Sequence, residues 1–544
     1  MTAARVAGVP SDGRCNARGR DDLVQCWLML ATSPRPAWLS RRYLIGSATL
    51  SWATGLVLLV VFSRHDLAKE YFFDEAWRAD IIRSAHPLAR MRRINTAIPP
   101  LWPVLLHLSS RLMPSGFRSL RMQSLALSAT FPAMVGLIGE AGWVRHAGDR
   151  ASPRSTLIAG MVAAIVVCVV GNSINIVAYL NDYLTQAATV AMFVAAWVLA
   201  DEELISPTWI AGAGMLLGVG TLSGMFVIPG LLVLAWPRRR DRLGRTTLAA
   251  LGLAVTLAGM LYLTLYRRQV DDGLRVFWAP ELLRQGTHSL VQMGPYFVRS
   301  MARLVVVYTD RPTLSLLLGL VVLALAIVGM VATWAKNRWL GCLTLSGIVV
   351  TVLASVVAEW PVTAVRVNLP VIWLVALSCG FGAWTVFRRL GSGFAGPLAV
   401  LALTALLALQ VHTYVSSSVQ PFARGLHRDL DVIRASTADH VVVVGYHFMS
   451  EPYIDDGVFN EAADPQRFQF LYERGDDSSS VYESLGASLA ARNLAAGTEV
   501  WCVIPFEIGS DAADRACRLD PSRYEFFYRE WRSRALLIGA RVRS

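Results

Sequence analysis

The 544-residue sequence is poor in charge and almost devoid of lysine. Only 17% of its residues are charged, whereas 54% are hydrophobic, and its mean hydropathy is +0.45. A soluble protein of this length carries more charge, so the composition predicts many membrane spans. Lys69 and Lys336 are the only lysines. The arginines form short clusters between apolar segments, a pattern typical of residues that determine the orientation of membrane spans. Because they do not form one basic patch, they argue against a nucleic-acid partner.

Several motifs are also absent. The sequence has no Walker motif and no soluble Rossmann half, which disfavours ATP-driven or nucleotide-sugar chemistry. Residues 1–42 are rich in Arg, Gly and Pro and lack the apolar core of a signal peptide. We therefore expect residues 1–42 to form a disordered cytoplasmic tail.

The region 43–419 consists mainly of apolar segments. Because Arg35, Arg41 and Arg42 precede the first of them, we expect a cytoplasmic N-terminus. Spans are expected at 43–63, 119–141, 155–172, 183–200, 208–236 (two spans), 246–266, 313–334, 339–357, 367–387 and 394–414. This gives about eleven transmembrane helices, an odd number that places the C-terminus outside. Basic clusters fall at each cytoplasmic turn except 201–207, which is acidic.

The first external loop, 64–118, is expected to contain juxtamembrane helices. Segment 98–113 is apolar, but at about sixteen residues with several prolines it is too short to cross the bilayer comfortably. Upstream of it, one helix face is expected to be apolar at every fourth position: Phe73, Trp77, Ile81 and Ala85. Asp74 and Arg78 would be neighbours on a more polar face, and Pro87 ends the pattern. Such an amphipathic helix suits a membrane surface.

The order of these features resembles the GT-C superfamily of polytopic glycosyltransferases. The matching pieces are the acidic pair Asp74–Glu75 after a first span, and then PPLWPVLLH at 99–107. Among its members, the sequence is most similar to the protein O-mannosyltransferases and the bacterial enzymes that add aminoarabinose to lipid A. The resemblance implies transfer of a sugar from a polyprenyl-phosphate donor on the extracytoplasmic face.

Asp74 is the candidate base for an inverting, single-displacement reaction, in which it deprotonates the acceptor hydroxyl. The alternative is that Asp74 and Glu75 only cap an interfacial helix, where carboxylates are favoured in the first turn. Glu75 is either an alternate base or a ligand to a divalent cation such as Mg or Mn. Because members of the superfamily differ in metal dependence, we assign no metal site.

A second similarity lies at 359–369, EWPVTAVRVNL, where bacterial relatives carry an aromatic–Pro pair followed by Arg and Asn before a late span. Arg366 is the candidate ligand of the donor phosphate, since a guanidinium binds phosphate bidentately. The alternative is an arginine that snorkels to the membrane interface. Weaker candidates are Arg78, Arg92 and Arg93 for the phosphate, and His86, Asn368, Tyr179, Asp182 and Tyr183 for substrate.

From about residue 420 the composition becomes that of a soluble domain. Apolar runs at 441–448, 500–508 and 535–542 predict strands, and 481–494 predicts a helix, so we expect a small extracytoplasmic α/β domain over 420–544. Cys502 and Cys517 are its only cysteines. Outside the cytoplasm they are expected to pair, closing a loop of about fifteen residues and contributing roughly 3 kcal/mol.

The sequence thus predicts a polytopic α-helical protein of a bacterial plasma membrane. It would transfer a hexose or pentose from a polyprenyl-phosphate donor to a glycan, lipid or protein acceptor. One alternative is a transporter or flippase for lipid-linked sugars, which would predict charged residues within spans and an inverted repeat. The other is a non-catalytic membrane scaffold, which would leave the region of Asp74 unexplained.

Overall fold

The computed structural model describes most of the helical region and the strands of the C-terminal region. The described residues are 38–63, 73–92, 98–113, 117–148, 151–169, 180–267, 294–295, 297–299, 312–357, 360–361, 365–389, 430–445, 464–472, 489, 491–505, 519–531 and 535–544. Most of the predicted tail, the predicted span 394–414 and most of the predicted helix 481–494 lie outside them.

Six of the described helices are long and apolar enough to cross a membrane. They are Arg41–Val61, Arg118–Ala147, Tyr183–Asp201, Arg242–Tyr266, Leu316–Val356 and Val367–Phe387. Four shorter apolar helices accompany them: Leu101–Ser110, Pro153–Cys168, Thr208–Gly220 and Ser223–Arg238. The protein is therefore a multi-pass helical membrane protein, and the total of about eleven spans stays a prediction.

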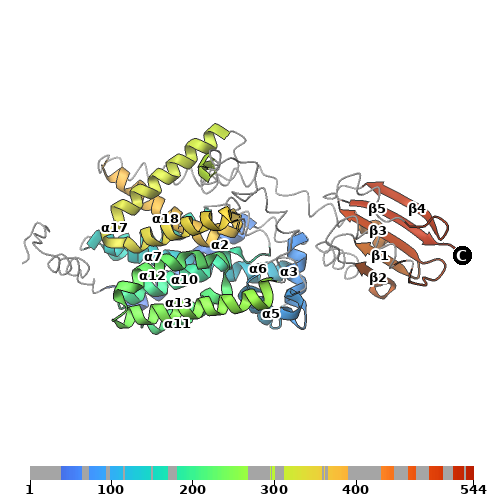
Figure 1. Cartoon of the computed structure of the whole chain (residues 1–544), viewed down its shortest axis with the longest axis horizontal. Coiled ribbons are helices and arrows are strands. Elements are labelled where there is room, and N and C mark those ends of the chain that lie inside the picture. The colour runs from blue at the N-terminus through green and yellow to red at the C-terminus, as the bar shows by residue number, and fades with distance from the viewer. Residues whose placement is uncertain are drawn as a thin grey trace, which may run out of the picture.

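Helix α10 (Tyr183–Asp201) is the centre of the bundle. Almost every residue in it is buried, and it packs against α7 (Thr130–Ala147), α11 (Thr208–Gly220) and α18 (Val365–Arg389). Its sequence is apolar and alanine-rich on all sides, as expected of a helix with neighbours all round. Figure 1 shows α10 between these helices.

Helix α17 (Pro312–Val356) contains a sharp kink at Asn337, where φ is −126° and ψ is 44°. A Cβ added at Gly341 would lie 2.6 Å from the Trp334 ring, a distance possible only if the chain turns back on itself. Asn337 Nδ2 donates to the carbonyl of Gly142 at 3.0 Å. The two spans predicted at 313–334 and 339–357 thus correspond to the two arms of α17, pinned to α7 at their turn.

The first predicted external loop contains three short helices at one end of the bundle: α3 (Phe73–Arg83), α4 (Pro87–Met91) and α5 (Leu101–Ser110) (Figure 1). Helix α5 has 10 residues, in keeping with the short helix predicted at 98–113. His107 Nδ1 lies 2.8 Å from the carbonyl of Ile82 and so joins α5 to α3. The amphipathic pattern predicted for α3 is only partly correct, because Arg78 is buried and Ala85 is exposed beyond the end of the helix.

The C-terminal region forms a five-stranded sheet of order β2-β1-β3-β5-β4. Its strands are β1 (Val441–Gly445), β2 (Phe468–Tyr472), β3 (Glu499–Pro505), β4 (Tyr524–Trp531) and β5 (Ala535–Val542). Strand β1 is parallel to β2 and β3, whereas β5 is antiparallel to β3 and β4. Strands β1, β3 and β5 lie in the predicted apolar runs, and β2 and β4 were not predicted.

Both faces of the sheet are covered, which explains the continuous apolar runs of the central strands. Val442, Val444 and Cys502 are buried on one face, and Val441 and Val443 are buried on the other. Strand β4 lies at the edge and most of its side chains are exposed. Cys502 is disulfide-bonded, whereas Cys517 lies outside the described residues. Their pairing and the extracytoplasmic location of the sheet stay predictions.

Candidate functional site

Glu75 anchors α3 in the protein interior. Its side chain is fully buried, and Arg121 of α6 (Phe117–Ser128) binds both carboxylate oxygens, with Nε 2.9 Å from Oε1 and Nη2 2.6 Å from Oε2. The backbone N–H of Leu180 also donates to Oε1. A carboxylate held in this way is poorly placed to accept a proton from a substrate or to bind a cation. These contacts indicate a structural role for Glu75, and its alternative role as a base or metal ligand stays a prediction.

Arg78, one turn further along α3, forms a second buried ion pair. Its Nη2 lies 3.5 Å from Asp182 Oδ1, and the two side chains are only 5% and 2% exposed. The guanidinium carbon lies 5.8 Å from the centre of the Tyr183 ring, within the range of a cation–π contact. Asp182 therefore balances the charge of Arg78 within the protein, and the expected phosphate contact of Arg78 stays a prediction.

Asp182, at the N-terminal end of α10, is held by two neighbours. Burial raises the pKa of its carboxyl, and this effect is opposed by the charge of Arg78 and by a hydrogen bond from Gln186. Gln186 Nε2 donates to Asp182 Oδ2 at 2.7 Å. The structure thus gives Asp182 a structural role, the positioning of Arg78, and a contact of Asp182 or Tyr183 with substrate stays a prediction.

The same network continues to the start of α18. Gln186 Oε1 accepts a hydrogen bond from the N–H of Leu222 at 3.1 Å. The adjacent Ser223 hydroxyl donates to the carbonyl of Val367 at 2.9 Å. Val367 follows Arg366 in the first turn of α18. We call this chain of contacts, from Arg78 through Asp182, Gln186 and Leu222–Ser223 to Val367, the α3–α18 relay.

Asn368 fixes the Trp–Pro corner that precedes α18. Its Nδ2 donates to the carbonyl of Pro361 at 2.7 Å, and its Oδ1 accepts from Trp360 Nε1 at 2.8 Å. Trp360 in turn packs edge-on against Phe226, with ring centres 5.3 Å apart. Asn368 is buried and stabilises this corner, and its predicted contact with substrate stays a prediction.

The remaining sequence candidates fall into two groups. Asp74 lies in the first turn of α3 and Arg366 in the first turn of α18, but their side chains lie outside the described residues. Tyr179 and Arg93 lie wholly outside them. His86 and Arg92, at the two ends of α4, are exposed. Across the described ranges, no group of three His, Cys, Asp or Glu side chains offers a site for Mg or Mn.

Three important residues were missed by the sequence analysis. Arg121 stands in the first turns of an apolar stretch, and the cost of a charge there is a signal for a buried partner. Gln186 is four residues after Asp182, a spacing that places the two side chains together on a helix. Tyr266 has a buried hydroxyl without a hydrogen-bond partner in the described part of the chain, within electrostatic range of Asp182.

No protein-family model matches the sequence, and no curated protein matches it either. Among solved structures, the chain is similar to the crystal structure of ArnT from Cupriavidus metallidurans in the apo state, with a TM-score of 0.49 and 12% identity over 91% of this chain and 98% of that one. The structure of that ArnT bound to undecaprenyl phosphate gives a TM-score of 0.40 at the same identity and coverage. ArnT is the lipid A aminoarabinose transferase, a GT-C enzyme.

Proposed function

We propose that the protein is an integral membrane glycosyltransferase of the GT-C type, which transfers a sugar from a polyprenyl-phosphate donor to an acceptor hydroxyl. The observation that carries this proposal is the α3–α18 relay. It ties the helix that bears Asp74 to the helix turn that bears Arg366, although the two residues are far apart in the sequence. These are the residues for which the motifs predict a base and a phosphate ligand.

The reaction that suits this pair is a single displacement. The acceptor oxygen forms a bond to the anomeric carbon while the bond between that carbon and the donor phosphate oxygen breaks. Asp74 takes the acceptor proton, and the lipid phosphate leaves with the bonding electrons beside the Arg366 guanidinium. Attack opposite to the leaving group inverts the anomeric configuration.

The relay contributes to this reaction by fixing the helix that bears Asp74 relative to the helix turn that bears Arg366. Effective catalysis requires the reacting groups to be placed to within fractions of an ångström, and buried side chains held by hydrogen bonds or ion pairs keep such positions best. Arg78, Asp182 and Gln186 are buried, and each has its partner on another element or on the next turn. We therefore regard them as positioning residues.

Asp74→Asn tests the proposed role of the acid. The purified full-length protein, in nanodiscs, is given labelled polyprenyl-phosphate hexoses and pentoses together with a cell-envelope extract, and transfer of label is measured. We expect the variant to lose about 10²–10⁴-fold in rate with an unchanged melting temperature. Asn caps a helix about as well as Asp. Near-normal transfer by the variant would therefore show that Asp74 only caps the helix, and it would contradict the proposal.

One observation favours transport of a lipid-linked sugar as a second candidate function. Glu140 of α7 is buried inside a membrane span, where Ser47 of α2 (Arg41–Ser63) donates a hydrogen bond to its Oε1. Ionisable residues in spans often serve ion or proton pathways. In liposomes containing labelled donor, movement of the donor across the bilayer without transfer, and its loss in Glu140→Gln, would identify a transporter. Transfer that Glu140→Gln leaves intact would exclude this role for Glu140.

A further inference from the structure

A groove opens on the surface of the bundle between α11 and α13 (Arg242–Leu261), at the end opposite to the candidate site. The far end of α13 continues to Tyr266, which packs with Ile81 of α3 and Met91 of α4. The N-terminal end at Arg242 is separated from Tyr266 by about 36 Å at the rise of a helix, enough to cross a bilayer. The groove thus belongs to the other membrane face.

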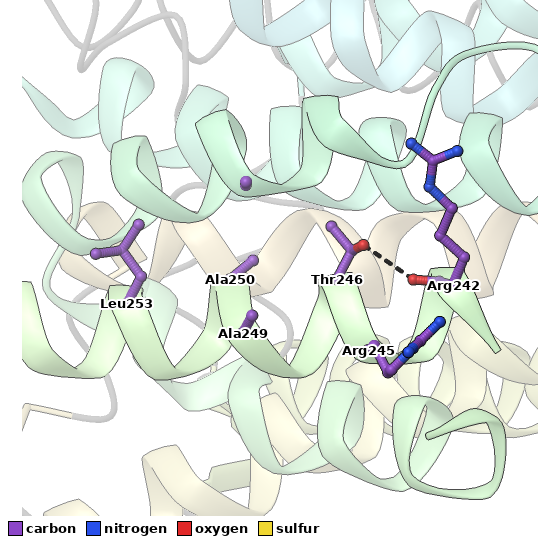
Figure 2. A pocket seen from close by; sticks show the side chains of 7 residues that line it. Arg242, Arg245, Thr246, Ala249, Ala250 and Leu253 are labelled. Carbon is purple, nitrogen blue, oxygen red and sulfur yellow. Dashed lines mark hydrogen bonds between the residues drawn. The ribbon is translucent and has the colours of Figure 1, made fainter. Parts of the chain in front are cut away.

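Small residues create this groove. It has a volume of about 470 Å³ and is lined by Ala211 of α11 and by residues from the N-terminal half of α13 as far as Leu253, including Ala249 (Figure 2). The two helices approach closely at Gly214, where an added Cβ would lie 2.7 Å from the carbonyl oxygen of Ala250. At Gly212 an added Cβ would meet nothing within 4 Å. The helices are therefore in contact along one line and leave an open furrow beside it.

The furrow has a cationic end and an apolar end. Arg242 and Arg245 line it at one end, and Leu253 lies at the other (Figure 2). Both arginines are exposed, and no salt bridge joins either of them to an acidic residue in the described part of the chain. The nearby carboxylate of Asp241 lies within electrostatic range of Arg245, but it already binds Arg238 and the N–H of Gly244.

Large apolar side chains are exposed on both helices that border the groove. Leu253 is 41% exposed on α13, which is long and apolar enough to cross a bilayer, and Trp209, near the start of the shorter apolar helix α11, is 62% exposed. An exposed Trp at a helix end is typical of the membrane interface. An amphiphile with a negative head and an acyl chain fits such a site, because guanidinium groups bind phosphate oxygens and the alanines leave room for a chain.

We propose that this groove binds an anionic phospholipid of the leaflet opposite to the candidate site. The phosphate lies between the guanidinium groups of Arg242 and Arg245, and one acyl chain lies over Ala249 and Leu253. Basic pockets between membrane helices are the places where anionic head groups are retained. The proposal depends on the membrane placement of α11 and α13 and is independent of sugar transfer.

Native mass spectrometry of the full-length protein released from detergent tests this proposal. The protein is equilibrated with phosphatidylglycerol or phosphatidylcholine, and the lipid-bound fraction is measured over a concentration series. We expect phosphatidylglycerol to be retained more strongly than phosphatidylcholine. The double variant Arg242→Gln/Arg245→Gln should weaken phosphatidylglycerol binding about thirtyfold and leave phosphatidylcholine unchanged.

The matched control is Arg41→Gln/Arg42→Gln. It removes the same charge from exposed positions at the same end of the bundle, since Leu44 of α2 packs with Leu199 near the end of α10. Ala249→Leu, which narrows the furrow and keeps both arginines, should also weaken binding. Equal losses in the two double variants would show general charge attraction only, and full binding by Arg242→Gln/Arg245→Gln or by Ala249→Leu would overturn the proposal.

Discussion

Arg121 and Glu75 form a bidentate ion pair buried inside the protein, with Nη2 and Oε2 2.6 Å apart and side chains 3% and 0% exposed. It joins α6, at the start of a membrane span, to α3, the helix that bears Asp74. Removing one partner of such a pair leaves an uncompensated charge in a medium of low dielectric constant. We therefore expect the two neighbouring acidic residues to have different roles, Glu75 in stability and Asp74 in proton transfer.

Glu75→Gln is expected to destabilise the protein. The variant leaves the Arg121 guanidinium buried without its counter-charge, which costs about 3–5 kcal/mol. The melting temperature in detergent should fall clearly below that of Asp74→Asn, which serves as the control at the adjacent position. A Glu75→Gln protein that melts like the wild type but has lost transfer would instead indicate a chemical role for Glu75.

Arg366→Lys is expected to weaken binding of the lipid-phosphate donor. Lysine keeps the positive charge but loses the planar fork that binds two phosphate oxygens at once. The KM for the donor should rise several-fold while the KM for the acceptor stays constant, and direct binding of the donor lipid should weaken in parallel. Wild-type donor affinity in this variant would favour the alternative of an arginine that only snorkels to the interface.

Ser223→Ala tests the α3–α18 relay. The substitution removes the 2.9 Å hydrogen bond to the Val367 carbonyl, and a bond of this kind contributes about 1 kcal/mol. If the relay sets the position of Arg366, the KM for the donor should rise about fivefold. Tyr43→Phe is the matched control, because it removes a hydroxyl hydrogen bond to a distant backbone carbonyl, that of Pro153 at 3.2 Å, and neither residue belongs to the relay. Equal kinetic effects in both variants would show that the relay has no special role.

The sheet is expected to lose stability in acid through Glu499. Burial alone would raise the pKa of its carboxyl, but hydrogen bonds from Arg541, Ser436 and Trp501 outweigh burial and hold the pKa below its usual value. A lowered pKa in the folded state means that the stabilisation is present above the usual carboxyl value and disappears as the pH falls through the folded-state pKa.

Hydrogen exchange of β3 peptides in the full-length protein, corrected for the intrinsic effect of pH, measures this dependence. Protection should be constant at neutral pH and should decrease below about pH 4.5, where the unfolded carboxyl begins to take up protons. Glu499→Gln should be less protected at neutral pH and should lack this acid-dependent step. An acid step of the same size in Glu499→Gln would assign it to another group.

Periodicity and composition predicted the features of this fold that depend on local pattern. Apolar runs long enough for a bilayer indicated α2, α10, α13 and α18, and a run too short to cross indicated α5. Runs of buried valine and isoleucine indicated β1, β3 and β5. Strand β4 was not predicted because it is an edge strand with mostly exposed side chains: its sequence, YEFFYREW, is rich in aromatic residues but has no regular alternation of apolar and polar positions.

Only the tertiary structure shows which charged residues that are distant in the sequence form ion pairs. The acidic turn 201–207 is the exception to the pattern of basic clusters, and the structure explains it: Asp201 and Glu202 bind Arg145, and Asp201 also binds Arg238. In the same way, Arg78 meets Asp182 and Glu75 meets Arg121 because α3 folds back against α6 and the start of α10. A residue type and its spacing can show that a charge needs a partner, but which partner it finds depends on how the helices pack.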